Sequence, residues 1–138
     1  MNLEILFSIV SGLAATSWIT LILFSHSPKV RKFLKYIVVV FLFGGLYSGL
    51  ISIGLQNSEG NFSTLKSVKL LFQNDYALLA GWVHYLAFDL FIGIWETEDA
   101  REMGINRWIM ILPLFLTFYF GPMGLLIYFV MRTIKQRY

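Results

Sequence analysis

Four long apolar runs separated by charged segments constrain the fold of this chain more than any other feature. The runs cover residues 3–24, 33–55, 76–95 and 108–131. An α-helix of about 20 apolar residues can cross the hydrocarbon core of a bilayer, which is ~30 Å thick. Only 14% of the 138 residues are charged, whereas soluble domains average about 25%. We therefore expect one transmembrane domain, residues 1–138, folded as an all-α integral membrane four-helix bundle.

The longest polar segment lies between the second and third runs. Within residues 62–72, apolar residues recur at helical spacing while Lys66 and Lys69 lie on the other side. This pattern predicts a short amphipathic helix at the membrane interface, or alternatively a loop helix that covers the bundle. Asn74 is typical of an N-cap for the third span, and Gly104 is typical of a helix C-cap after it.

The fourth run contains a strong helix-breaking signal. Residues 121–124 read Gly-Pro-Met-Gly, and a proline inside a helix removes one backbone hydrogen bond and clashes with the preceding turn. We therefore predict a kink or break in the middle of the fourth span. Inside a membrane, the carbonyl groups freed by such a break must be satisfied by neighbours or by a cavity.

The basic residues do not fix the orientation of a four-span protein. Six of the eleven Lys and Arg residues would lie on one side of the membrane and five on the other. The positive-inside rule needs a clear asymmetry, so no orientation follows. Because these charges flank apolar runs, we expect the membrane as a partner and no nucleic acid. The expected location is a bacterial inner membrane, or a plastid or thylakoid-type membrane.

Small residues in the first two runs predict close helix packing. Gly45 and Gly49 stand four residues apart in the second run, while Ser8, Gly12 and Ala15 form a stripe in the first. Small side chains let helix backbones approach closely in lipid. These faces also suggest that copies of the chain associate into homo-oligomers.

The third run carries most of the ionisable groups that lie within a span, namely His84, Asp89 and Glu96. A charged group inside a span costs about 2.5–3.5 kcal/mol on insertion scales, so each needs a reason to be there. Seven-residue spacing places Asp89 and Glu96 on one stripe of the helix with Asp75 and Trp82. His84 lies five residues before Asp89, about 140° around the helix, and therefore faces elsewhere.

Two interpretations of Asp89 are equally open. Its carboxyl group can be hydrogen-bonded to a neighbouring helix, through a hydroxyl or through a carbonyl freed near Pro122. It can instead give and take a proton near neutral pH inside an apolar pocket. For His84, a neutral imidazole bridging two helices is slightly favoured, and Glu96 fits a carboxylate at the interface. The charged residues 98–102 read as a cluster in a loop.

The chain has no cysteine and only two histidines, His26 and His84. Disulfide frameworks, thiolate nucleophiles and enzymes that need several histidines are therefore excluded. A two-ligand metal clamp on a helix needs a spacing of three or four residues. Neither His84 and Asp89 nor Asp89 and Glu96 has that spacing, so we expect no metal, and we expect no other cofactor.

Three polar patterns mark the second half of the chain. They are W-x-H-x-x-x-x-D at residues 82–89, W-E-x-x-D-A at residues 95–100 and F-G-P-x-G-L-L at residues 120–126. With these patterns, residues 74–132 resemble the abscisic-acid-deficient-4-like family of small four-span membrane proteins. Plant members of that family are linked to neoxanthin synthesis from the epoxide violaxanthin.

The resemblance implies a membrane protein that modifies a carotenoid or isoprenoid by cofactor-independent acid/base isomerisation of a xanthophyll-like epoxide. It implies three catalytic candidates: His84, Asp89 and Glu96. The expected substrate-binding residues are Asp75, Trp82, Tyr85, Phe88, Trp95 and Pro122. The ligand would be an apolar small molecule, either a carotenoid or a lipid. The alternative is a non-catalytic protein that binds such a ligand or assembles a biosynthetic complex.

Overall fold

A computed structural model of the chain describes residues 2–137, and all regular secondary structure in that range is helical. The elements are α1 (Leu3–Phe24), α2 (Pro28–Phe33), η1 (Leu34–Phe43), α3 (Gly44–Gln56), α4 (Leu65–Leu71), α5 (Asp75–Glu102), α6 (Ile111–Phe120) and α7 (Pro122–Arg137). The predicted all-α class is therefore confirmed. Three helices are long and apolar enough to cross a membrane, namely α1, the continuous helix Pro28–Gln56 and α5.

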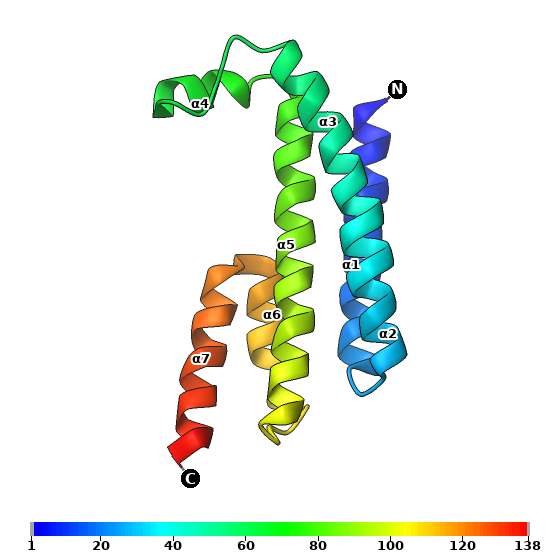
Figure 1. Cartoon of the computed structure of the whole chain (residues 1–138), viewed down its shortest axis with the longest axis vertical. Coiled ribbons are helices and arrows are strands. Elements are labelled where there is room, and N and C mark those ends of the chain that lie inside the picture. Colours follow the sequence, from blue (N-terminus) through cyan, green and yellow to red (C-terminus); the bar gives the residue numbers. More distant parts are fainter. Residues whose placement is uncertain (1, 138) are drawn as a thin grey trace.

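The first two long helices form a hairpin beside α5 (Figure 1). The bounds of α1 match the predicted first span, and the side chain of Asn2 caps it by accepting from the backbone N–H of Glu4 at 3.0 Å. The second helix starts earlier than the predicted residue 33, because Ser27 caps it and Pro28 suits a first helical turn. Its middle part, η1, is π-helical, which no pattern in the sequence predicts.

Helix α5 is the central element and contacts both helical hairpins of the molecule (Figure 1). Asn74 caps its start and Gly104, with a φ of +65°, follows its end, as predicted. The helix runs seven residues past the predicted end at residue 95. It continues because Glu98 pairs with Lys35 at 3.2 Å and Asp99 pairs with Arg132 at 2.7 Å. The prediction of a charged loop at residues 98–102 is therefore wrong.

Glycines let neighbouring helices approach α5 closely. The indole of Trp18 on α1 packs directly over Gly93 of α5. At the other end, a Cβ atom added to Gly54 of α3 would lie 2.7 Å from the backbone nitrogen of Ala77. By contrast, Gly45 and Gly49 are exposed, and an added Cβ would have no atom within 4 Å. Among the described residues, the predicted small-residue face of the second run therefore packs against nothing, and homo-oligomers stay a prediction.

The predicted fourth span does not cross the molecule. Its residues form two shorter helices, α6 and α7, which run antiparallel on the other side of α5 (Figure 1). The chain reverses at Gly121, whose φ of +46° is a conformation that favours glycine. Gly124 of α7 packs against Thr117 of α6, and its added Cβ would lie 2.6 Å from the carbonyl oxygen of Pro113. The predicted break exists, but it produces a hairpin, so the predicted four-helix bundle is not confirmed.

The predicted amphipathic helix between the second and third spans is α4. The side chain of Thr64 caps it by accepting from the backbone N–H of Ser67 at 3.1 Å. It extends sideways from the end of α5 near Asp75 (Figure 1). Leu65 is 87% exposed, whereas Leu71 is fully buried over Gly60. The helix is therefore confirmed, and its position at a membrane interface stays a prediction.

Candidate functional site

The carboxyl group of Asp89 lies at the tip of the α6–α7 hairpin. A Cβ atom added to Gly121 would lie 2.9 Å from its Oδ1 and 3.2 Å from its Oδ2, so no larger residue fits there without a shift. The Oδ2 atom is buried and has no hydrogen-bond partner among the described residues. A buried polar atom without a partner is rare in folded proteins. The buried Oδ2 atom therefore makes Asp89 a candidate for contact with a ligand.

Glu96, two helical turns further along the same stripe, has a different environment. Its side chain is fully buried, and the Thr117 hydroxyl lies 3.1 Å from each of its carboxylate oxygens. Thr117 is itself fully buried in α6. The hairpin therefore covers Glu96 completely, and the expected interfacial carboxylate is instead a buried contact between α5 and α6.

Tyr85 satisfies the backbone at the broken end of α6. Its hydroxyl lies 3.0 Å from the carbonyl oxygen of Phe118 and 3.2 Å from that of Tyr119, and its single hydrogen is donated to one of these atoms or shared between them. The last carbonyls of a helix have no partner within the helix. A neighbouring helix thus satisfies carbonyls freed by the break, as the sequence predicts for a membrane-embedded break.

His84 faces away from Asp89, as the helical spacing predicts. Its ring stacks on Phe88 with centroids 4.6 Å apart, and it lies 5.5 Å from the ring of Tyr47 on α3. The imidazole is exposed, and its contact with Tyr47 joins α5 to α3, while a hydrogen-bonded bridge between two helices stays a prediction. The backbones of His84 and Asp89 are about 9 Å apart on an ideal helix, and Tyr85 projects between them.

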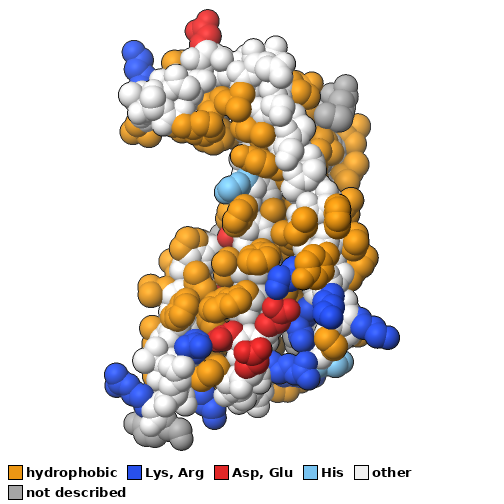
Figure 2. Space-filling view, viewed as in Figure 1, with side chains coloured by type: hydrophobic (Ala, Val, Ile, Leu, Met, Phe, Trp, Pro, Cys, Tyr) orange, Lys and Arg blue, Asp and Glu red, His pale blue; other side chains and the backbone are white. Residues whose placement is uncertain are grey.

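An apolar hollow lies on α5 between α4 and the hairpin tip. Figure 2 shows it as the indentation of the molecule between these two elements. Between α4 and the hairpin tip, α5 carries exposed or half-buried Leu78, Trp82, His84, Tyr85 and Phe88, which helical spacing places within about 160° around the helix. We call this surface the α5 hollow. Leu78 is 55% exposed and Phe88 is 59% exposed although both are large apolar residues on a central helix. His84 lies at one edge of this surface, and Asp89 lies about 140° around the helix from it, beside the hairpin tip.

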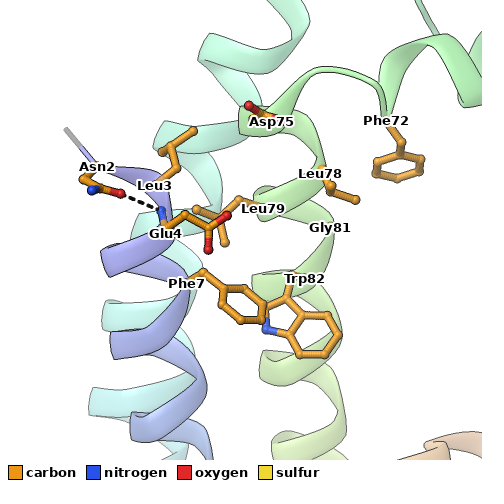
Figure 3. A pocket seen from close by; sticks show the side chains of 10 residues that line it. All are labelled: Asn2, Leu3, Glu4, Phe7, Phe72, Asp75, Leu78, Leu79, Gly81 and Trp82. Atoms are coloured by element: carbon orange, nitrogen blue, oxygen red, sulfur yellow. Dashed lines mark hydrogen bonds between the residues drawn. The ribbon is translucent and has the colours of Figure 1, made fainter.

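A cleft of about 950 Å³ adjoins the α5 hollow at the upper end of α5. Figure 3 shows Phe7 and Trp82 at its lower end and Asp75 at its upper end, with Glu4 between them. Trp82 is held in place because its indole N–H donates to the Ser11 hydroxyl at 3.0 Å. The cleft is therefore lined by aromatic side chains and by two acidic groups, Glu4 and Asp75.

The remaining predicted binding residues lie apart from this cleft. Trp95 is half-buried against α7, with its ring edge-on to Tyr128 at a centroid distance of 5.7 Å. Pro122 is exposed at the hairpin tip, where it begins α7. Tyr128 also donates to Asp99. The sequence did not predict this contact, because residues 98–102 were expected to form a loop.

No metal site is assembled within residues 2–137. In that range no three His, Asp or Glu side chains come together in an arrangement that could hold an ion. Asp89 lies about 140° around the helix from His84, and Glu96 is sealed beneath the hairpin. The titratable side chains of Asp89 and His84 therefore lie apart from each other on α5.

Long apolar helices and a carboxyl group beside a broken helix define an α-helical membrane protein with polar groups in its interior. The chain belongs to the ABA DEFICIENT 4-like family, whose model matches residues 5–128. The resemblance seen in residues 74–132 is thereby confirmed, and the match extends through α1 and the second long helix. Neither the curated proteins nor the solved structures gave a match.

Proposed function

We propose that this protein acts in carotenoid metabolism and isomerises a xanthophyll-like epoxide in the α5 hollow. The family name connects the chain with the pathway of neoxanthin and abscisic acid. The observation that carries the proposal is that His84 lies at one edge of this apolar surface and Asp89 lies about 140° around the helix from it, beside the hairpin tip. Such a surface suits an apolar ligand, and the two side chains suit proton transfer at its polar end group.

The reaction needs one proton donor and one proton acceptor. The acid gives a proton to the epoxide oxygen as a carbon–oxygen bond breaks. The base removes a proton from the adjacent polyene carbon, and the electron pair of that carbon–hydrogen bond forms the new double bond of the allene. One proton is gained and one is lost, so the product is an isomer and no redox cofactor takes part.

Separation of the two groups suits this chemistry. The oxygen that gains a proton and the carbon that loses one are different atoms of the substrate, so acid and base act from different sides. Asp89 and His84, whose backbones lie about 9 Å apart on an ideal helix and whose side chains diverge by about 140°, would act on these two atoms when the end group lies across α5 between them. Glu96 fits this role poorly because the hairpin covers it fully.

The height of the α5 hollow suits one end group of the substrate and is too small for the whole molecule. Phe72 closes the upper side at Gly81, and Gly121 closes the lower side at Asp89. Eight residues of α5 separate these two positions, which is about 12 Å. A cyclic end group fits in that height, while the polyene, as long as the ~30 Å core of the bilayer, would continue into the lipid.

The test is conversion of an epoxy-carotenoid by the protein purified in detergent, followed by chromatography. Asp89→Asn and His84→Gln should each lower the rate roughly 100-fold or more, as expected for loss of an acid or base. Glu102→Gln, an exposed change on the same helix, serves as the matched control and should keep the native rate. Absence of product with the native protein would reject the isomerase.

The second candidate is a non-catalytic protein that binds a carotenoid or lipid. It is favoured by one observation, that Asp89 and His84 make no hydrogen bond to each other and so form no preassembled acid/base pair. In this case Asp89→Asn and His84→Gln would retain the pigment or lipid that copurifies with the native protein. Mass spectrometry of the extracted ligand distinguishes the two candidates when it is combined with the rate measurement.

A further inference from the structure

The α6–α7 hairpin returns to the end of the molecule from which it starts. Arg132, near the end of α7, pairs with Asp99 near the end of α5 at 2.7 Å. The α5–α6 loop also meets the last turns of α7, since Ile105 and Lys135 line a common pocket. The start of α6 and the end of α7 therefore lie together, with the hairpin tip near the middle of α5.

The loop between α1 and α2 lies at this same end. Lys35 and Arg31 both approach Glu98 of α5, at 3.2 Å and 3.8 Å. Three chain segments thus meet here: the α1–α2 loop, the α5–α6 loop and the end of α7. The N-terminus and α4 lie at the opposite end (Figure 1). We call the end where the three segments meet the basic end.

Nine of the eleven Lys and Arg residues lie at the basic end, and only Lys66 and Lys69 lie at the other. Figure 2 shows this concentration of basic side chains over the lower part of the molecule. The ion pairs with Glu98 and Asp99 engage three of the nine. Six are exposed: Lys29, Lys32, Arg101, Arg107, Lys135 and Arg137.

The length of α6 agrees with a hairpin that enters only half of the bilayer. Its 10 residues span about 15 Å, half of a ~30 Å hydrocarbon core. Just before it, the guanidinium of Arg107 lies 4.6 Å from the ring centre of Trp108, which is 65% exposed. Exposed tryptophan beside a basic residue is typical of the membrane–water interface.

We infer that α6 and α7 form a re-entrant hairpin and that the basic end faces the cytoplasm, against the anionic lipid headgroups of the inner leaflet. A re-entrant segment returns to its side of origin, so the chain crosses the membrane three times and its ends lie on opposite sides. The positive-inside rule then places the basic end on the cytoplasmic side, because nine basic residues lie at this end and two at the other.

Residues 1–138 contain no cysteine, which allows a direct test. Single cysteines replace three exposed residues in three variants: His26→Cys in the α1–α2 loop, Gln73→Cys before α5 and Gln136→Cys near the end of α7. Each variant is produced in a bacterial inner membrane and treated with a membrane-impermeant maleimide, before and after permeabilisation. None of the three side chains takes part in the hollow, so the readout is independent of the isomerase proposal.

The expected result is that Gln73→Cys reacts in intact cells, while His26→Cys and Gln136→Cys react only after permeabilisation. A fourth complete crossing would place Gln136→Cys on the side of Gln73→Cys and would overturn the hairpin. If Gln136→Cys and His26→Cys agree but both react from outside, the assignment of the basic end to the cytoplasm is wrong.

Removal of positive charges tests whether the basic end binds anionic lipid headgroups. Lys29→Gln, Lys32→Gln and Arg101→Gln are combined, since these exposed residues make none of the ion pairs. The protein extracted in mild detergent should retain at least twofold less anionic phospholipid per chain than the native protein, measured by mass spectrometry. Equal anionic lipid on both proteins would overturn the headgroup contact, and Lys66→Gln with Lys69→Gln serves as the matched control.

Discussion

Asp89 of α5 and Gly121 of the hairpin tip are in direct contact, and the contact requires glycine for two separate reasons. Gly121 has a φ of +46°, and its added Cβ would lie 2.9 Å from Oδ1 of Asp89. The tip of the hairpin and the carboxyl group of Asp89 therefore depend on each other. Any change that moves the tip also moves the lower edge of the α5 hollow.

Gly121→Ala should therefore disturb both stability and function. A non-glycine residue at this φ of +46° and ψ of −101° costs about 1–3 kcal/mol, and the contact with Asp89 adds to that cost. Gly104→Ala is the matched control, because Gly104 also has a positive φ of +65° but has no atom near its added Cβ. Thermal unfolding in detergent should show the larger loss for Gly121→Ala. Equal losses would mean that the Asp89 contact contributes nothing.

A second glycine tests the hairpin itself. Gly124→Ala places a methyl group against the backbone of α6, within 2.6 Å of the Pro113 carbonyl oxygen and in contact with Thr117. Overpacking of this kind costs about 1–3 kcal/mol. Gly49→Ala, in an exposed helical position with open space, should instead leave stability unchanged or raise it slightly. Comparable thermal unfolding of the two variants would argue against the tight α6–α7 packing.

Local signals in the sequence predict much of the fold. The caps at Asn74 and Gly104, the amphipathic segment that forms α4 and the break at Gly121 all follow from short-range physics. The reversal of chain direction at Gly121 does not follow from these local signals. A proline kink and a hairpin share the same local signal, and the difference depends on whether α7 packs back on α6. That choice rests on Gly124 and on the Arg132–Asp99 pair, which are long-range contacts.

In the candidate site, too, local sequence signals predict some features, and the others depend on long-range contacts. Helical spacing correctly separates His84 from Asp89 and places Glu96 on the Asp89 stripe. It does not tell which part of the stripe a neighbouring helix covers. The hairpin ends at Asp89, so Glu96 is sealed while Trp82 is 38% exposed. The length of α6 decides this difference, and no pattern within α5 contains that information.

Tyr85→Phe should weaken the hairpin tip. The single hydroxyl hydrogen of Tyr85 is donated to the carbonyls of Phe118 and Tyr119 at the end of α6, either to one of them or shared between the two. Its loss should lower the free energy of unfolding by about 0.5–1.5 kcal/mol, with little change in apolar packing. Tyr36→Phe is the matched control, since Tyr36 is 54% exposed on the second helix. Equal thermal stability of both variants would show that lipid or water satisfies these carbonyls instead.

Substitutions of Thr117 and Glu96 test whether the carboxyl group of Glu96 has a structural or a catalytic role. Thr117→Val removes the hydroxyl donor and leaves a fully buried carboxyl group without it, so we expect a loss of about 1–3 kcal/mol in thermal unfolding. Glu96→Gln keeps an oxygen that accepts from Thr117 and should cost less. Thr133→Val is the control, because the Thr133 hydroxyl only bonds its own exposed helix.

The activity of Glu96→Gln then decides its role. Because the hairpin covers Glu96 and leaves Asp89 at the edge of the hollow, Glu96→Gln should retain conversion of an epoxide within a few-fold of the native rate, whereas Asp89→Asn should not. If a stably folded Glu96→Gln protein loses conversion as completely as Asp89→Asn does, the hairpin must open during the reaction. In that case the substrate reaches the α5 stripe below Gly121, and the catalytic pair includes Glu96.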